Sequence, residues 1–183
     1  YHFAILFEAL FILTAIDTVS KIAFARMYTS KSSMNAADFL RRVVYLLDGA
    51  VVNTLNDNGS EFHKEFMEAC KELNLTQYWS RVKTPTDNPV DERFNRTLRE
   101  EFIELGHFTS DTIQFNRELT EWLVEYTFQR PHQTLGYDTP WDNWPVIGIS
   151  KKMGFAFLRP TGELRFERYD PVASTDLQQR VHE

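Results

Sequence analysis

The feature that most constrains this chain is the β-prone run over residues 11–16, which is apolar except for Thr14. A strand without alternating polar residues is buried on both faces, as strands are in sheets covered by helices. A second strand is expected over residues 21–28, after a short polar turn. Farther along the chain, predicted strands alternate with predicted helices. Together these patterns predict an α/β domain of three layers with a mixed sheet.

Helix caps and apolar spacing predict the remaining elements. Ser32 or Ser33 can cap the first helix and Ser60 the second, and Asn88 can cap the third, where Pro89 takes the first helical position. The third helix ends at Gly106 and has an apolar stripe formed by Phe94, Leu98, Phe102 and Leu105. The expected helices cover residues 34–47, 60–73, 89–105 and 111–129, and the expected short strands cover 50–55 and 75–79.

The 183 residues are most simply one domain with a short appendage. We expect a core over residues 1–140 and a tail over 141–183. Two β-prone runs in the tail, 155–158 and 164–169, flank a turn at 160–162, which predicts a C-terminal β-hairpin. The single cysteine, Cys70, excludes an internal disulfide framework and lies in an apolar helical pattern that favours a packing role.

Hydropathy and charge limit the kinds of partner that the chain is expected to bind. The apolar segment over residues 3–16 is too short for a membrane span, and it lacks the basic start and cleavage site of a signal peptide. We therefore expect a cytoplasmic protein without a membrane partner. The formal net charge of −6 is not typical of a nucleic-acid-binding protein. Affinity for DNA would have to come from local basic patches, from oligomerisation or from another domain.

Asp57 follows the predicted strand over residues 50–55 and begins the word Asp57-Asn58-Gly59-Ser60-Glu61-Phe62. One interpretation is an ordinary polar turn. The other is a metal ligand at the carboxyl edge of a sheet, where sites of α/β domains usually form. Asn58 and Gly59 would then let the backbone turn sharply and keep bulk away from a phosphate.

Glu92 comes 35 residues after Asp57, in the first turn of the predicted third helix. It is two positions from Phe94, about 200° around the helix, so it points away from the apolar stripe. A surface pair with Arg96 would contribute only about 0.3–0.5 kcal/mol. The alternative is a carboxylate that shares a divalent metal with Asp57, because two acids on rigid elements suit metal-assisted phosphoryl transfer.

The words around Asp57 and Glu92 resemble the catalytic core of DDE transposases and retroviral-type integrases, in particular the bacterial insertion-sequence branch. Arg130-Pro131-His132, followed by Thr139-Pro140, matches a word found at the end of such cores. The resemblance spans residues 11–140 and implies a ribonuclease H-like fold. It implies DNA strand cleavage and strand transfer, with transposon ends and target DNA as partners. It further implies a homo-oligomer and Mg²⁺ or Mn²⁺ as cofactor, with two ions in the active complex.

The resembled family uses three carboxylates, and here the match is incomplete. Asp17 is the candidate for the first one, but relatives carry that aspartate one strand earlier, and Glu8 is the only acid that precedes Asp17. Three interpretations stay open: the chain begins after the missing residue, its N-terminal segment is degenerate, or Asp17 serves as the catalytic metal ligand. In the first two cases Asp17 is structural and this copy is inactive.

Basic and amide side chains near Glu92 are candidate DNA contacts. In the resembled family the segment before the glutamate helix is a loop beside the active site. Such residues would contact phosphates and position DNA without reading its sequence, although each also fits a solvated surface. The candidates are Arg81, Lys83, Arg93, Asn95, Arg96 and Arg99.

Other interpretations of the same residues remain. His132 more simply has a structural role, satisfying backbone groups after Pro131 ends the preceding helix. The chain as a whole could be a catalytically inactive transposase remnant that binds DNA or oligomerises. A third possibility is a ribonuclease H-like nuclease that cleaves RNA–DNA hybrids.

Overall fold

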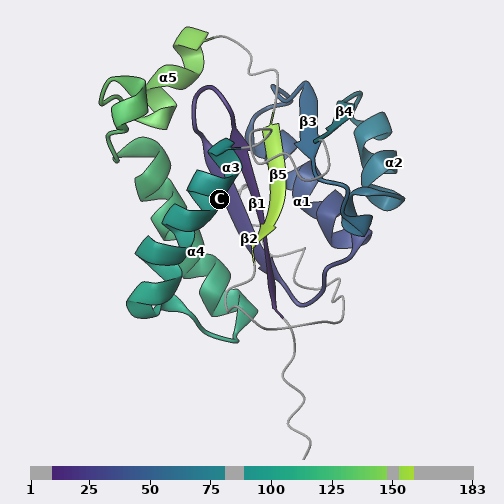
Figure 1. Cartoon of the computed structure of the whole chain (residues 1–183), viewed down its shortest axis with the longest axis horizontal. Helices are drawn as coiled ribbons and strands as arrows, with labels where there is room; N and C mark the ends of the chain where they lie inside the picture. The colour runs from purple at the N-terminus through teal and green to yellow at the C-terminus, as the bar shows by residue number, and fades with distance from the viewer. Residues whose placement is uncertain (1–9, 81–88, 148–152, 159–183) are drawn as a thin grey trace, which may run out of the picture.

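The computed structural model describes residues 10–80, 89–147 and 153–158. Within these residues, five strands form one sheet in the order β2-β1-β5-β3-β4 (Figure 1). β1 pairs antiparallel with β2 and β5, whereas β3 pairs parallel with β5 and β4. The mixed sheet expected from the sequence is therefore confirmed. The strands are β1 (Phe11–Asp17), β2 (Ala23–Tyr28), β3 (Asn53–Asn56), β4 (Thr76–Trp79) and β5 (Met153–Leu158).

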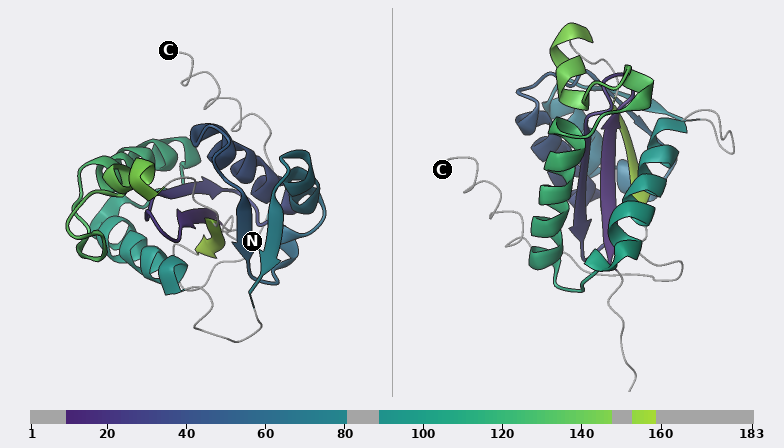
Figure 2. Two further views of the ribbon diagram at one scale, coloured as in Figure 1. Left: turned by 90° about the horizontal axis from the view of Figure 1, so that it is seen from above. Right: turned by 90° about the vertical axis from the view of Figure 1, so that its left-hand side faces the viewer.

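Helices cover both faces of the sheet and give the three layers (Figure 2). Residues of β1 alternate between two cores: Leu13 and Ala15 pack toward α1 and α2, and Ile12 and Ile16 pack toward α3 and α4. This explains why the run over residues 11–16 is apolar at nearly every position. The helices are α1 (Ser33–Leu46), α2 (Glu65–Glu72), α3 (Pro89–Leu98), α4 (Thr112–Phe128) and α5 (Pro140–Ile147).

Two predicted helices differ from the structure. The helix predicted over residues 60–73 divides into a 3-10 turn, η1 (Ser60–Phe62), and α2, because Lys64 has a φ of 43° between them. The helix predicted over residues 89–105 continues past α3 as a π-helical segment, η3 (Arg99–His107). A π-turn holds more residues than an α-turn, so the register of the apolar stripe shifts. Leu105, predicted to face the core, is 70% exposed for this reason.

The tail differs most from expectation. The strand predicted around residues 155–158 exists as β5, but it lies in the middle of the core sheet, between β1 and β3. The predicted C-terminal hairpin appendage is therefore wrong for this strand, whose hydrogen bonds go to β1 and β3. The second predicted strand, over residues 164–169, lies outside the described residues. α5 had no counterpart in the sequence prediction.

Cys70 is buried beside Thr54, and burial raises the pKa of its thiol to about 11, which fits the expected packing role. In the part of the chain that the structure describes, no helix is long and apolar enough to cross a membrane.

Candidate functional site

Strand β3 ends at Asn56, and Asp57 follows it directly with an exposed side chain. The backbone N–H of Gly59 donates a hydrogen bond of 2.9 Å to Asp57 Oδ1. This short polar turn holds the carboxylate outside the sheet, at the carboxyl end of β3. Both predicted features of Asp57, its turn and its place at a strand end, are present in the structure.

The side chains of β3 and β5 show which face of the sheet Asp57 belongs to. Leu55 and Gly154 are register partners in the parallel β3–β5 pair. A Cβ atom on Gly154 would lie 2.7 Å from Cγ of Asp91, so this face of the two strands lies against α3. Side chains alternate along a strand, and Asp57 is two positions after Leu55. If this alternation is continued one residue beyond β3, it assigns Asp57 to the side of the sheet that α3 covers.

Glu92 lies in the first turn of α3 and is exposed, as the sequence predicts from its distance to Phe94. The contact between Asp91 and Gly154 places this same turn against β5, one strand away from β3. Asp57 and Glu92 thus come from neighbouring parts of one face of the domain. No group of three or more acidic, histidine or cysteine side chains forms a metal-binding cluster among the described residues.

Asp91 is a residue that the sequence reasoning missed. It is 3% exposed, and neither of its carboxylate oxygens has a hydrogen-bond partner in the described part of the protein. Burial, followed by the charge of Glu92, raises its pKa to about 8. Its position gave a signal, because it precedes Phe94 by three residues and Leu98 by seven, on the apolar stripe of α3.

Asp17 occupies a different environment. It is the last residue of β1 and is fully buried. Because it comes two positions after Ala15, it lies on the same face of the sheet as Ala15, the face that α1 and α2 cover. Its Oδ2 atom accepts hydrogen bonds from the Ser20 backbone N–H at 2.6 Å and the Ser20 hydroxyl at 2.7 Å. The structure therefore places Asp17 on the face opposite α3, where it closes the turn between β1 and β2.

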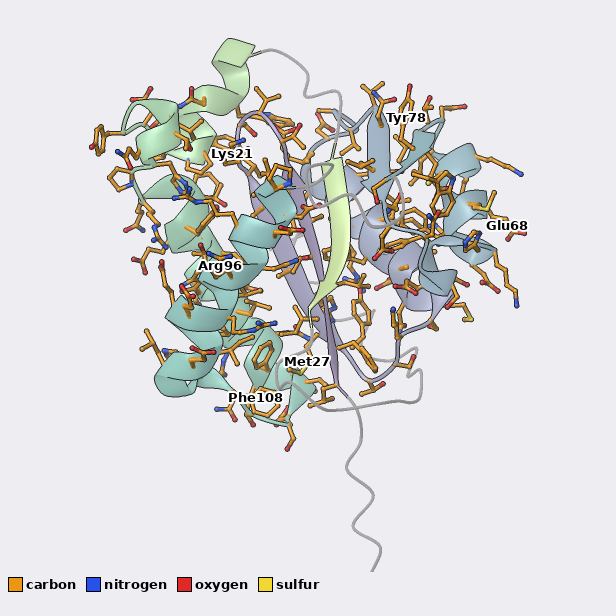
Figure 3. All side chains as sticks on the ribbon, viewed as in Figure 1. Lys21, Met27, Glu68, Tyr78, Arg96 and Phe108 are labelled. Atoms are coloured by element: carbon orange, nitrogen blue, oxygen red, sulfur yellow. The ribbon has the colours of Figure 1, made fainter. Side chains whose placement is uncertain are left out.

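The candidate DNA contacts lie along one helix where the structure describes them. Arg93, Arg96 and Arg99 are exposed on α3 and the start of η3, and Arg96 is labelled in Figure 3. Asn95 is half-buried, and its Oδ1 atom is enclosed without a hydrogen-bond partner in the described residues. Arg81 and Lys83 lie outside the described residues.

The Arg130-Pro131-His132 motif connects the end of α4 to neighbouring elements. Arg130 Nη2 donates to Glu101 Oε1 on η3 at 2.8 Å, and its guanidinium lies over the Tyr126 ring, 5.8 Å from the ring centre. The His132 ring nitrogen Nε2 lies 3.4 Å from the Tyr126 carbonyl oxygen, and the His132 N–H donates to the Asp138 carbonyl. Burial lowers the pKa of His132. These contacts agree with the structural role predicted for the motif.

The catalytic core domain of BIV integrase superposes with a TM-score of 0.56 at 22% sequence identity, over 74% of this chain and 86% of that one. The mixed sheet between two helical layers is therefore the fold of retroviral integrase cores, which is ribonuclease H-like. Two family models, both described as integrase core domain, match residues 2–85 and 73–140. Between them, the two integrase core domain models match this chain over residues 2–140.

Two curated proteins are similar in sequence. A putative integrase, ORF3, of Spiroplasma virus SpV1-C74 is 23% identical over 153 residues, which are 74% of this chain and 42% of that protein. The putative transposase InsD for insertion element IS2E of Escherichia coli (strain K12) is 28% identical over 95 residues, 51% of this chain and 43% of that protein. The chain thus spans less than half of the length of these relatives.

Proposed function

We propose that this chain is a transposase or integrase catalytic core that cleaves and transfers DNA strands with a divalent metal. The observation that supports this most directly is the shared face of Asp57 and Glu92. Asp57 follows the carboxyl end of β3 on the face covered by α3, and the α3 turn that carries Glu92 lies against the adjacent strand β5. Both carboxylates are exposed and can reach a substrate phosphate.

The donor set fits Mg²⁺ or Mn²⁺. Mg²⁺ sites that act on phosphates typically use one or two protein carboxylates, with the remaining positions filled by water and substrate oxygens. Asp57 and Glu92 would supply these two carboxylates. Divalent ions held there would supply charge stabilisation and activation of water or of a DNA 3′-hydroxyl. The protein's own contribution is to orient the two carboxylates from a strand end and a helix.

DNA is the proposed substrate, as transposon ends and target, and the arginines of α3 are its proposed phosphate contacts. Arg93, Arg96 and Arg99 are exposed on the helix that carries Glu92. They supply local positive charge to a chain whose formal net charge is −6. Asn95, Arg81 and Lys83 complete the proposed set of DNA contacts. We further propose that the protein acts as a homo-oligomer in the cytoplasm.

A strand-transfer assay tests this proposal. Purified protein is incubated with transposon-end DNA, target DNA and Mg²⁺ or Mn²⁺. Asp57→Asn and Glu92→Gln are each expected to abolish metal-dependent joining without changing the unfolding temperature. Asp48→Asn and Glu100→Gln are matched controls, because each neutralises an exposed carboxylate. Asp48 lies in a turn, and Glu100 lies in η3, the continuation of α3. Undiminished joining by either site variant would refute the assignment.

A second candidate function is a catalytically inactive relative that binds DNA. Two observations favour it: β5, the strand between β1 and β3, contains no carboxylate, and Asp17 lies on the face opposite α3. Joining of DNA by the wild-type chain eliminates this candidate. Binding of DNA that weakens in Arg96→Ala, with no joining in either metal, supports it instead.

A further inference from the structure

An ion pair between a buried carboxylate and a partly exposed lysine lies next to the Asp57 turn. Glu61, in η1, is 2% exposed, and its Oε1 atom lies 2.7 Å from Nζ of Lys31. Lys31 belongs to the segment between β2 and α1. A carboxylate withdrawn from water is costly unless it is paired, so Lys31 fixes where Glu61 can remain.

Glu61 in turn fixes Gly59. A Cβ atom on Gly59 would lie 2.6 Å from Cδ of Glu61. The backbone of Gly59, at φ −64° and ψ 142°, is one that any residue adopts. What distinguishes glycine here is the space taken by the Glu61 carboxylate, which any Cβ at this position would displace. The N–H of the same Gly59 donates to Asp57 Oδ1. Contacts therefore run without interruption from Lys31 through Glu61 and Gly59 to Asp57.

The surrounding backbone is held independently of this pair. Gln77 Nε2 donates to the Phe62 carbonyl at 2.9 Å, and the Ser33 hydroxyl donates to the Glu65 carboxylate. Phe62 and Phe66 are fully buried in the core beneath α1 and α2. Loss of the Lys31–Glu61 pair therefore leaves η1 and α2 anchored, and its effect is concentrated on the Asp57 turn.

We infer that Lys31 and Glu61 are positioning residues for the metal ligand Asp57: the ion pair presses Glu61 against Gly59 and so orients the turn that presents the carboxylate. This inference rests on the proposed function for the role of Asp57. The contact chain itself can be tested without metal or DNA.

The first experiment reads the Asp57 turn directly. The amide proton shift and exchange rate of Gly59 are measured by NMR in metal-free protein. Glu61→Gln, which keeps the shape of the side chain, and Lys31→Met are expected to speed Gly59 exchange several-fold. Glu72→Gln is the control, because the Arg41–Glu72 pair also measures 2.7 Å but joins exposed side chains of α1 and α2. An unchanged Gly59 amide in both pair variants overturns the inference.

The second experiment reads the metal ligand. Mn²⁺ affinity is measured by electron paramagnetic resonance for the wild type and the same variants. Glu61→Gln is expected to weaken Mn²⁺ binding about 10-fold, as the loss of groups that orient metal ligands typically does, whereas Lys31→Arg retains it. Equal Mn²⁺ binding by wild type and Asp57→Asn contradicts the proposed function, and the Gly59 amide still decides the inference.

A double-variant comparison separates positioning from general stability. Gly59→Ala forces the Glu61 carboxylate away from Lys31, so it is expected to have the same effect on Mn²⁺ affinity as Glu61→Gln. Combined in one protein, the two changes are expected to weaken binding no more than either alone. Additive losses, or losses that follow the unfolding temperature across all variants, show a merely structural role and overturn the inference.

Discussion

At the scale of single residues, burial separates two neighbouring acids on α3. Glu92 is exposed, while Asp91 is 3% exposed with both oxygens unpartnered in the described residues. An unpaired carboxylate in such a place costs stability, because it loses hydration without gaining a partner. The Asp91 carboxylate is therefore expected to destabilise the folded protein, whereas the exposed Glu92 carboxylate keeps its hydration.

Asp91→Val is expected to stabilise the protein. Valine has a similar size, and it replaces an unpartnered polar group with an apolar one on the stripe that includes Phe94 and Leu98. The expected gain is about 1–3 kcal/mol in the free energy of unfolding at pH 7, measured by urea denaturation in EDTA. Glu92→Val, on the exposed side, serves as control and should change stability by less than about 0.5 kcal/mol. A destabilised Asp91→Val protein would contradict the account of this site.

His132 gives a pH dependence with a defined sign. Burial lowers its pKa below the ordinary value of 6.5, so the folded protein holds it neutral while the unfolded chain takes up a proton. Its contribution to stability is present above pH 6.5 and is lost as pH falls through the lowered pKa. In His132→Gln, the fall in unfolding temperature from pH 7.5 to pH 5 should be smaller than in the wild type. Equal falls in the two proteins would show that another group controls this range.

The sequence predicted the exposed site residues better than the buried ones. Asp57 and Glu92 lie where a strand end and the polar side of a helix place them, and both positions follow from local periodicity. The burial of Glu61 and its pairing with Lys31 depend on a contact across 30 positions of sequence. Local patterns carry no information about such a contact, so neither the pair nor the close approach of Glu61 to Gly59 could be predicted.

At the scale of elements, long-range pairing limited the prediction in the same way. The apolar run of β5 was recognised as a strand, but its partners, β1 and β3, lie more than 90 positions earlier in the chain. Sequence periodicity predicts that a segment is a strand and leaves its neighbours undetermined. The π-helical continuation of α3 likewise shifted Leu105 away from the core, against a strict 3.6-residue period.

The packing of α3 on β5 predicts a specific clash. Gly154→Ala would place a methyl group 2.7 Å from Cγ of Asp91, so the buried Asp91 side chain or the first turn of α3 would have to shift. The expected cost is about 1–3 kcal/mol in the free energy of unfolding. The same substitution should cost much less in an Asp91→Ala background, where the obstructing carboxylate is gone. Equal costs in the two backgrounds, measured by denaturant titration, would show that α3 and β5 do not meet as described.

At the scale of the whole molecule, one edge of the sheet is partly open. β2 is an edge strand, and Asn116 of α4 covers the backbone of Met27 through hydrogen bonds of 2.7 and 3.0 Å. Farther along the same edge, a cavity of about 720 Å³ lies between β2, α1 and α4. Neither Asp57 nor Glu92 lines it. Large exposed apolar side chains border this groove: Tyr45, Leu46, Val124, Phe128 and Trp141.

For the homo-oligomer proposed above, a second copy of this chain is the occupant that we expect in the groove. On one side, α1 presents Arg41, which pairs with Glu72 at 2.7 Å while its side chain stays 46% exposed. On the other side, α4 presents Glu121 and Glu125 beside Val124. In a two-fold dimer each α1 would face the α4 of the other copy, so opposite charges and apolar surfaces would meet twice. Burial of exposed apolar groups supplies the driving force for such an interface.

Val124→Asp is therefore expected to convert the protein from dimer to monomer in sedimentation equilibrium at micromolar concentration. The new carboxylate would lie in the apolar groove beside Phe128, and next to Glu125 it would add repulsion to the cost of dehydration. Ile113→Asp is the matched control, because Ile113 is an exposed apolar residue of the same helix that does not line the groove. A Val124→Asp protein that remains dimeric, or a wild type that is monomeric at these concentrations, would remove the groove as the contact between copies. Strand transfer by a protein that is folded but monomeric would further show that the two carboxylates of one chain act without a partner.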